Sequence, residues 1–236
     1  MTAEEVARLQ EDRTVDYYPV IGSTMQAATG RPLRTVVIAE TQTAGQGRHG
    51  NSWHSEPGNG IYVSIVLKPA PLLTLALGLA TVDAITNVTG IACDLRWPND
   101  VMVGGKKAAG ILVQLDGQNA IGGIGINVNH SEFPPELAAI ATSLRLAAGR
   151  QFSGFEILHE LLQAVDTFSE LDAGSILRLF ARASSYVSGR RVVVDQPGGS
   201  VEGVTAGLDP AGYLILRRDD GTDTLIIAGG VRAAGT

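Results

Sequence analysis

The segment from Val101 to Asn129, VMVGGKKAAGILVQLDGQNAIGGIGINVN, constrains the fold most, because two turn signals divide it into three apolar runs. These signals are Gly104-Gly105 and Asp116-Gly117, dipeptides that join neighbouring antiparallel strands. Two successive hairpins exclude an all-parallel sheet, in which crossover connections separate the strands. The segment therefore predicts a mixed sheet rather than a doubly wound parallel one.

Strand and helix signals alternate along the rest of the chain. Strands are predicted at 34–40, 60–69 and 93–100, and helices at 71–88, 155–171 and 174–184. From Gly189 onward, short strand segments alternate with glycine turns, which is typical of a small β-barrel. We therefore predict an α+β fold with a larger domain over residues 1–188 and a small β domain over 189–236.

Composition limits the classes of partner and compartment. The 236-residue chain has a formal net charge of −6, which argues against a broad surface for nucleic acid or membrane. The N-terminus is charged and lacks the apolar core of a secretory signal, and the apolar segment 71–88 contains Asp83. We expect a cytoplasmic protein without DNA or membrane partners. Its four histidines show no metal-ligand spacing in the sequence.

The segment TAGQGRHGNSW at 43–53, called the glycine loop below, contains a literal match to G-x-G-x-x-G. In a dinucleotide-binding fold a strand leads straight into these glycines and a helix opens at the last of them. Here TQTA separates the predicted strand from Gly45, and Pro57 with two further glycines follows where the helix would begin. The match is therefore not a dinucleotide fingerprint.

The residues of the glycine loop leave two interpretations open. Its glycines let backbone amides turn toward an anion, Arg48 can donate to a phosphate or carboxylate, and Trp53 offers a flat face to a base or an apolar ring. A surface loop whose tryptophan packs on the core has the same composition.

RWPND at 96–100 and KKAAGILVQ at 106–114 form a second cluster of polar residues. Asn99 and Asp100 lie at the end of a predicted strand, and Lys107 begins the next one beside small apolar residues. A lysine directed into an apolar hairpin costs solvation energy unless an anion meets it, which favours a ligand site. Solvated lysines at a turn are the alternative.

Two further segments admit both a structural and a ligand-binding interpretation. In GSTMQ at 22–26, Ser23 or Thr24 is either the N-cap of a helix or a ligand donor. In GIGINVN at 123–129, the glycines allow close approach of a ligand and Asn127 supplies a donor and an acceptor. A glycine-rich core strand with an asparagine at its edge fits the second segment equally well.

Taken in order, these motifs resemble the biotin protein ligases over residues 20–236, and WPND followed by K-x-AGIL is the most specific part. The resemblance implies a mixed-sheet catalytic domain with packed helices and a C-terminal SH3-like β-barrel. It also implies the monofunctional type, without the N-terminal DNA-binding domain of regulatory members, and it allows a homodimer through a sheet edge.

The activity implied by the resemblance has two steps. Biotin and ATP, with Mg²⁺, form biotinyl-5′-AMP, and biotin then passes to a lysine of a biotin carboxyl carrier protein. The catalytic residues would be Lys107, Arg48 and Asp100, and Asp100 is also the predicted metal ligand. The biotin-binding residues would be Ser23, Thr24, Gln42, Gly45, Lys107, Gly110, Leu112 and Gly125. The ATP or adenylate would contact Gly47, Arg48, Trp53, Asn99, Lys107 and Asn127.

The chain departs from the family pattern at three positions. Gln46 stands where the family commonly has arginine, Asn51 where it often has a basic residue, and Met25 where it usually has asparagine. The two lost charges predict a weaker hold on phosphate. The alternatives are a lipoate or octanoate ligase or transferase, and a biotin-binding module without catalysis. The polar set Ser23, Thr24 and Gln42 favours a ureido ring over a dithiolane or plain acyl chain.

Overall fold

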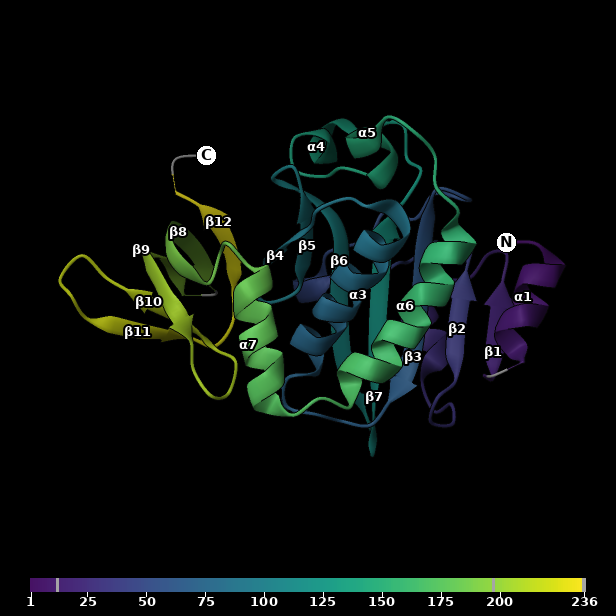
Figure 1. The fold of residues 1–236 in the computed structure, drawn as a ribbon, viewed down its shortest axis with the longest axis horizontal. Helices are drawn as coiled ribbons and strands as arrows, with labels where there is room; N and C mark the ends of the chain where they lie inside the picture. Colours follow the sequence, from purple (N-terminus) through teal and green to yellow (C-terminus); the bar gives the residue numbers. More distant parts are fainter. Residues whose placement is uncertain (12, 197, 235–236) are drawn as a thin grey trace.

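The computed structural model describes residues 1–11, 13–196 and 198–234, and arranges them as two β-sheets with helices packed on the larger one (Figure 1). The larger sheet has the strand order β1-β2-β3-β7-β6-β5-β4. Only the pairing of β1 with β2 is parallel among the strand pairs of this sheet that the structure describes. Its strands are β1 (Val15–Tyr18), β2 (Val36–Ala39), β3 (Gly60–Leu67), β4 (Asp94–Arg96), β5 (Asp100–Val103), β6 (Lys106–Asp116) and β7 (Asn119–Asn127). The predicted mixed sheet is confirmed.

Both predicted hairpins form where the glycines stand. β5 and β6 meet at Gly104 and Gly105, which have φ values of 57° and 80°. β6 and β7 meet at a turn in which Gly117 has φ 59°. Glycine adopts these left-handed conformations without the clash of a Cβ atom, so the two turns are determined locally by the sequence.

Helices cover both faces of the larger sheet. The helices are α1 (Ala3–Gln10), α2 (Thr24–Ala28), α3 (Leu73–Thr89), α4 (Pro135–Ala138), α5 (Leu144–Ala148), α6 (Gly154–Ser169) and α7 (Ala173–Ala183), with a 3-10 turn η1 (Arg48–Gly50). α3 and α6 lie side by side over one face (Figure 1). Successive residues of β7 face opposite sides, since Gly122 contacts Leu77 of α3 whereas Gly123 contacts Met25 of α2. The short helix α2 therefore packs on the face opposite to α3 and α6.

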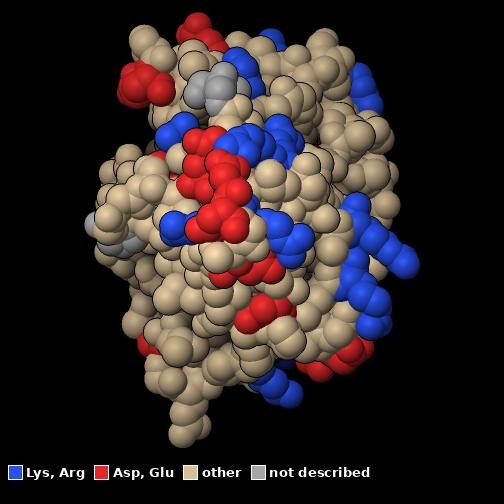
Figure 2. Space-filling view, turned by 90° about the vertical axis from the view of Figure 1, so that its left-hand side faces the viewer, with Lys and Arg blue, Asp and Glu red and all other residues tan. Residues whose placement is uncertain are grey.

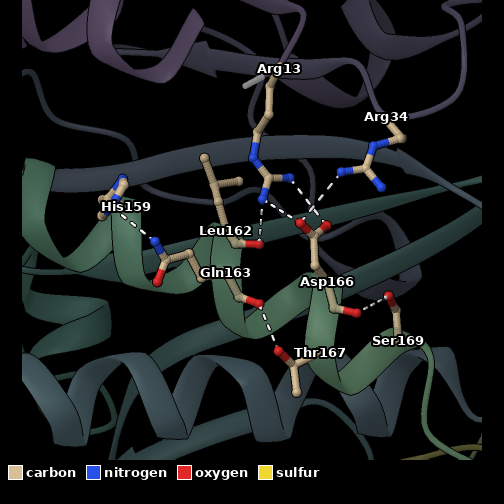
Figure 3. A network of polar contacts seen from close by, with 8 residues as sticks. All are labelled: Arg13, Arg34, His159, Leu162, Gln163, Asp166, Thr167 and Ser169. Carbon is tan, nitrogen blue, oxygen red and sulfur yellow. Dashed lines mark hydrogen bonds and ion pairs between the residues drawn. The ribbon is translucent and has the colours of Figure 1, made fainter. Parts of the chain in front are cut away.

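An ion-pair network attaches α6 to the N-terminal segment (Figure 3). Arg13 donates to both carboxylate oxygens of Asp166, at 3.2 and 2.6 Å, and to the Leu162 carbonyl at 2.9 Å. Arg34 approaches the same carboxylate at 3.6 Å. The forked arrangement of Arg13 is the stronger kind of ion pair, and it fixes α6 relative to the strand that follows Arg13.

The second sheet is antiparallel, with the strand order β11-β10-β9-β8-β12. Its strands are β8 (Ser188–Gln196), β9 (Gly199–Leu208), β10 (Leu214–Arg217), β11 (Asp223–Ile226) and β12 (Gly230–Ala233). The buried Trp97 of the larger domain donates through Nε1 to the Gly212 carbonyl at 2.9 Å. A β domain of this size needs such support, because it buries little apolar surface alone. The domain boundary at 188 stays a prediction.

Charges of both signs alternate on the face formed by the second sheet. Figure 2 shows acidic side chains in the middle of this view with basic side chains on both sides of them. Arg191 pairs with Glu202 and Asp219, and Arg217 pairs with Asp223. Exposed pairs of this kind contribute little to stability. Among the described residues, the structure contains no helix with the length and apolarity needed to span a bilayer.

Candidate functional site

A cavity opens on the α2 face of the larger sheet, between α2, the glycine loop and strands β6 and β7. It encloses about 440 Å³ of space, which includes solvent at its mouth. Its lining residues are Thr24, Met25, Gln42, Gln46, Gly47, Arg48, Trp53, Val63, Asn99, Lys107, Gly110, Ile111, Leu112, Gly123, Ile124 and Gly125. The fold therefore brings together most of the sequence-predicted site residues.

The floor of this cavity is a pair of facing glycines. Gly110 of β6 and Gly125 of β7 are directly opposite each other in the sheet. A Cβ on Gly110 would lie 2.9 Å from Trp53 Cζ3, and a Cβ on Gly125 would overlap the same indole ring. The missing side chains thus leave a flat backbone surface, and Trp53 lies directly against it.

One end of the cavity is a connected chain of polar side chains. The Thr24 amide and hydroxyl both donate to Gln42 Oε1, at 2.8 and 3.0 Å. Ser64 of β3 donates to the Thr24 hydroxyl at 2.8 Å, and Gln42 donates to the Ser55 hydroxyl at 3.1 Å. These contacts fix the orientation of the amide and hydroxyl groups that a polar ligand would meet. Ser64 and Ser55 were not among the residues predicted from the sequence.

Ser23 adjoins this polar chain but does not line the cavity. It occupies the N-cap position of α2, yet its side chain makes no capping hydrogen bond. The residue is 1 % exposed, and its hydroxyl has no hydrogen-bond partner among the described residues. A buried hydroxyl without a partner is costly, and the missing capping bond contradicts the capping interpretation of Ser23.

Lys107 lies at the centre of a charged triad. Its Nζ is 2.5 Å from Asp100 Oδ1, and Arg96 donates to Asp100 Oδ2 through Nε and Nη2 at 3.1 and 2.7 Å. Burial alone would raise the pKa of Asp100, but Lys107 and Arg96 more than offset this and hold it below its usual range. Two cations share one carboxylate, so the triad carries a net positive charge that suits an anionic ligand.

A register shift in the hairpin positions Lys107. Val101 pairs with Ala109 and Met102 pairs with Lys107, which leaves Ala108 as an extra residue in β6. Such bulges bend a strand and change the direction of neighbouring side chains. The Lys107 ammonium lies 5.4 Å from the centroid of the Trp53 ring, so the lysine and the indole border the same space.

The glycine loop is folded as a small hairpin over the cavity. Gln46 and Ser52 form an antiparallel bridge, and the Gly47 amide donates to the Asn51 carbonyl at 2.7 Å. A Cβ on Gly45 would lie 2.7 Å from the Trp53 carbonyl oxygen, so Gly45 allows the two ends of the loop to approach. Gly45 thus shapes the loop and does not line the cavity.

Arg48 connects the glycine loop to both domains. Its Nη1 donates to Asn99 Oδ1 at 2.8 Å and to the Gly229 carbonyl of the C-terminal sheet at 3.4 Å. Asn99 is itself held by a bond from Nδ2 to the Ile111 carbonyl at 2.9 Å. Burial lowers the pKa of Arg48, and the nearby Asp100 partly opposes this effect. Asn99 therefore positions the guanidinium group.

A second cavity lies on the other side of Trp53 and Lys107, with a volume of about 980 Å³ including open solvent. Asn127 belongs to this second cavity, where it lies with the apolar side chains of Phe133, Leu137 and Ile140. Its amide donates to the Thr142 carbonyl at 3.1 Å. Two cavities that meet at one lysine and one tryptophan suit a pair of ligands that react with each other.

Comparison with protein families assigns both sheets. The model of the biotin/lipoate A/B protein ligase family matches residues 17–131. This range contains Trp53 and Lys107, the two residues that line both cavities. The model of the biotin protein ligase C-terminal domain matches residues 187–231, which cover most of the second sheet.

Individual relatives agree with this assignment. The biotin–[acetyl-CoA-carboxylase] ligase of Mycobacterium tuberculosis is 34 % identical, over 92 % of this chain and 88 % of the relative. The bifunctional ligase/repressor BirA of Bacillus subtilis is 33 % identical, over 87 % of this chain and 70 % of the relative. The solved structure of an Aquifex aeolicus biotin protein ligase in complex with biotin and ATP superposes with a TM-score of 0.84 at 29 % identity, covering 94 % of this chain and 99 % of that one.

Proposed function

The chain belongs to the biotin protein ligase family, and on this premise we propose that it is an ATP-dependent biotin–protein ligase. The observation that carries the proposal is the pair of cavities that meet at Lys107 and Trp53. The first cavity has a polar end that suits the ureido ring of biotin, and a flat glycine floor that suits its aliphatic tail once Trp53 moves off the floor. The second cavity accommodates the nucleotide of ATP.

The first chemical step joins two anions, so charge neutralisation and positioning dominate its catalysis. A carboxylate oxygen of biotin attacks the α-phosphorus of ATP, and pyrophosphate leaves with the electrons of the broken P–O bond. Lys107 lies where the two cavities meet and stabilises the negative charge that accumulates there. Arg48 and the amides of the glycine loop hold the phosphate.

Asp100 has a positioning role in this arrangement. Both of its oxygens already accept bonds from Lys107 and Arg96, so the carboxylate does not fit a protein-held Mg²⁺. We therefore treat Mg²⁺ as part of the substrate, bound by the phosphates of ATP, and assign no step to Asp100 as its ligand. A carboxylate with a lowered pKa is also a weak base, so Asp100 orients Lys107 rather than deprotonating the incoming amine.

In the second step, a lysine amine of a carrier protein attacks the acyl carbon of the mixed anhydride, and AMP leaves. The acceptor is a biotin carboxyl carrier domain, consistent with the acetyl-CoA-carboxylase ligases among the relatives. Trp53 covers the intermediate and keeps water from it. We propose a cytoplasmic location, where ATP and a carboxylase carrier protein are both available. A homodimer through a sheet edge would use β1, because the segment after α7 covers β4, where the Ser185 hydroxyl donates to Asp94.

The proposed activity is tested by biotin-dependent exchange of pyrophosphate into ATP. Purified protein with Mg·ATP and biotin is expected to support exchange and to yield biotinyl-5′-AMP in the mass spectrum. A complete lack of exchange refutes the ligase. The same assay with lipoate or octanoate as competitor separates the rival ligases, because the polar contacts of Thr24 and Gln42 favour biotin. Biotin binding in a calorimeter without any adenylate would instead indicate a non-catalytic module.

Replacing Ser23 with alanine is expected to weaken biotin binding about tenfold without lowering stability, since roughly 1.4 kcal/mol corresponds to one lost hydrogen bond. The serine hydroxyl caps nothing in α2, so the melting temperature should be unchanged. Ser153→Ala is the matched control: Ser153 does cap α6, and this variant should melt earlier while biotin affinity stays normal. Calorimetry measures the biotin affinity of each variant, and thermal melts measure its stability. Equal biotin affinity in Ser23→Ala and wild type contradicts the assignment of Ser23 to the biotin site.

Restoring an arginine at Gln46 is expected to tighten adenylate retention by about tenfold, because Gln46 lines the first cavity and a guanidinium group there adds a charged contact to phosphate. The dissociation rate of biotinyl-5′-AMP is measured by chase with unlabelled biotin and ATP. Gln46→Lys adds the positive charge without the forked donor geometry of arginine, so it should slow adenylate dissociation less than Gln46→Arg does. An unchanged rate in both variants means that position 46 does not contact phosphate.

A further inference from the structure

Two histidines and one glutamate form a cluster at the edge of the second cavity, and the reaction described above uses none of them. One potential ligand atom from each of His54, Glu56 and His130 lies within 4.8 Å of the others. His54 Nε2 is 3.0 Å from Glu56 Oε1, and the two imidazole centroids are 6.0 Å apart. His130 is distant in sequence from His54 and Glu56, which explains why no spacing motif revealed the cluster.

His130 lacks the polar partner that a buried imidazole requires. It is 0 % exposed, and neither ring nitrogen has a hydrogen-bond partner among the residues that the structure describes. Its ring stacks on Phe133 at a centroid distance of 5.1 Å, which satisfies the ring faces but not the nitrogens. Unpaired buried polar atoms are rare, and an ion is one of the usual reasons for them.

The backbone around the cluster is held together across two loops. The Asn59 carbonyl accepts bonds from the Val128 and Asn129 amides at 3.0 and 2.7 Å, and so joins the loop before β3 to the segment after β7. The Asn59 side chain donates to Glu56 Oε2 at 3.2 Å, while Oε1 of the same carboxylate faces the histidine. Outer hydrogen bonds of this kind orient the ligands of metal sites.

Two imidazoles and one carboxylate suit a borderline divalent cation such as Zn²⁺, Co²⁺ or Ni²⁺, and not Mg²⁺ or Ca²⁺, which prefer oxygen ligands. Ligand atoms bound to Zn²⁺ at about 2.0–2.1 Å in a tetrahedral site lie about 3.3 Å apart, so the cluster must close by roughly 1.5 Å. The side chains of His54 and Glu56 are 30 % and 41 % exposed, so closing on the buried His130 requires no rearrangement of the core. Water completes the fourth position.

We propose that His54, Glu56 and His130 bind a Zn²⁺-class divalent cation that fastens the end of the glycine loop to the segment after β7. Trp53 directly precedes His54, so the bound metal restrains the residue that covers the glycine floor. The cation takes no part in adenylation. Its role is structural: it limits how far the C-terminal end of the glycine loop can move, and the site exists whether or not the chain is a ligase.

The test uses the full chain without an affinity tag, freed of metal by a chelator and studied without biotin or ATP. We expect one equivalent of Co²⁺ to bind with a visible d–d absorption band and Zn²⁺ to displace it. Zn²⁺ at about 100 times its Kd should raise the melting temperature by roughly 5–10 °C. MgCl₂ at the same concentration should change neither signal. A chain that binds neither Co²⁺ nor Zn²⁺ at micromolar concentrations overturns the proposal.

Three variants locate the site. His54→Ala and Glu56→Gln alter partly exposed side chains, so both should fold, and each should weaken Co²⁺ binding at least tenfold. His159→Ala is the matched control, because His159 lies on α6 and contacts Gln163 instead of the cluster. Wild-type Co²⁺ affinity in both cluster variants, or an equal loss in the control, refutes the assignment. None of these measurements depends on ligase activity, so their failure is distinguishable from failure of the proposed function.

Discussion

Lys107→Ala is expected to lower the rate of biotinyl-5′-AMP formation by about 1,000-fold, comparable to the loss of one strong electrostatic contact at a reacting centre. Lys107 is the cation that borders both cavities, and the substitution removes it from the place where the carboxylate and the α-phosphate meet. Because this charge develops most fully in the transition state, kcat should fall more than the biotin Kd rises. Single-turnover formation of the adenylate measures the effect directly.

The fold of the Lys107→Ala variant should survive, because Asp100 keeps its forked bond from Arg96. Lys106→Ala is the matched control: that neighbouring lysine is exposed and donates to the Ala138 carbonyl outside the cavities. We expect near-normal adenylation in the control and an unchanged circular dichroism spectrum in both proteins. Near-normal turnover in Lys107→Ala would show that the phosphate is neutralised elsewhere, with Arg48 as the next candidate.

Local signals made most of the fold predictable. The hairpins of β5, β6 and β7 depend on glycines at their turns, and each turn uses only residues adjacent in sequence. The strand predicted over 93–100 was wrong in its bounds, because β4 ends at Arg96 and Asp100 begins β5, the strand that pairs with the one carrying Lys107. The bulge at Ala108 was not predictable, because a register shift depends on how β6 packs against β5 and not on β6 alone.

The parts of the site that escaped prediction depend on contacts between distant residues. In the sequence, Ser64 is one polar residue within an apolar strand, and nothing there links it to Thr24. Only the packing of α2 on β3 brings the two hydroxyls together. Arg48 was predicted to meet phosphate, but its bond to the Gly229 carbonyl requires the C-terminal domain to dock against the glycine loop. Sequence patterns carry no information about such encounters unless the relative placement of the elements is known.

The cluster of His54, Glu56 and His130 also depends on a contact between distant residues, but strand pairing makes this contact predictable. β3 and β7 are antiparallel, and Gly60 pairs with Asn127, so the residues before β3 and after β7 emerge at the same end of the sheet. His54 and His130 occupy these two positions. Both strands were predicted but not their pairing, and without that pairing the spacing of the histidines along the chain showed no metal site.

Gly125→Val is expected to weaken biotin binding by at least about 100-fold, because the added side-chain atoms fill space that the ligand needs. A 100-fold loss of affinity corresponds to about 2.8 kcal/mol of binding free energy. The valine would occupy the flat floor between β6 and β7 and overlap the space where Trp53 now lies. Biotin and the indole would both have to move away from the sheet. Adenylation should fall with binding, since the carboxylate would no longer reach Lys107.

The strand itself should tolerate the valine. Gly125 is not among the described glycines with a left-handed φ, and β-branched residues suit extended backbone. Ile126→Val is the matched control, because its side chain faces the core on the opposite side of β7 and the change costs about 0.5–1.5 kcal/mol of stability. That control should melt earlier but bind biotin normally, whereas Gly125→Val should fold and fail to bind. If calorimetry finds biotin affinity within threefold of wild type in Gly125→Val, the glycine floor is not the biotin site, and the tail of biotin must lie along another wall of the cavity.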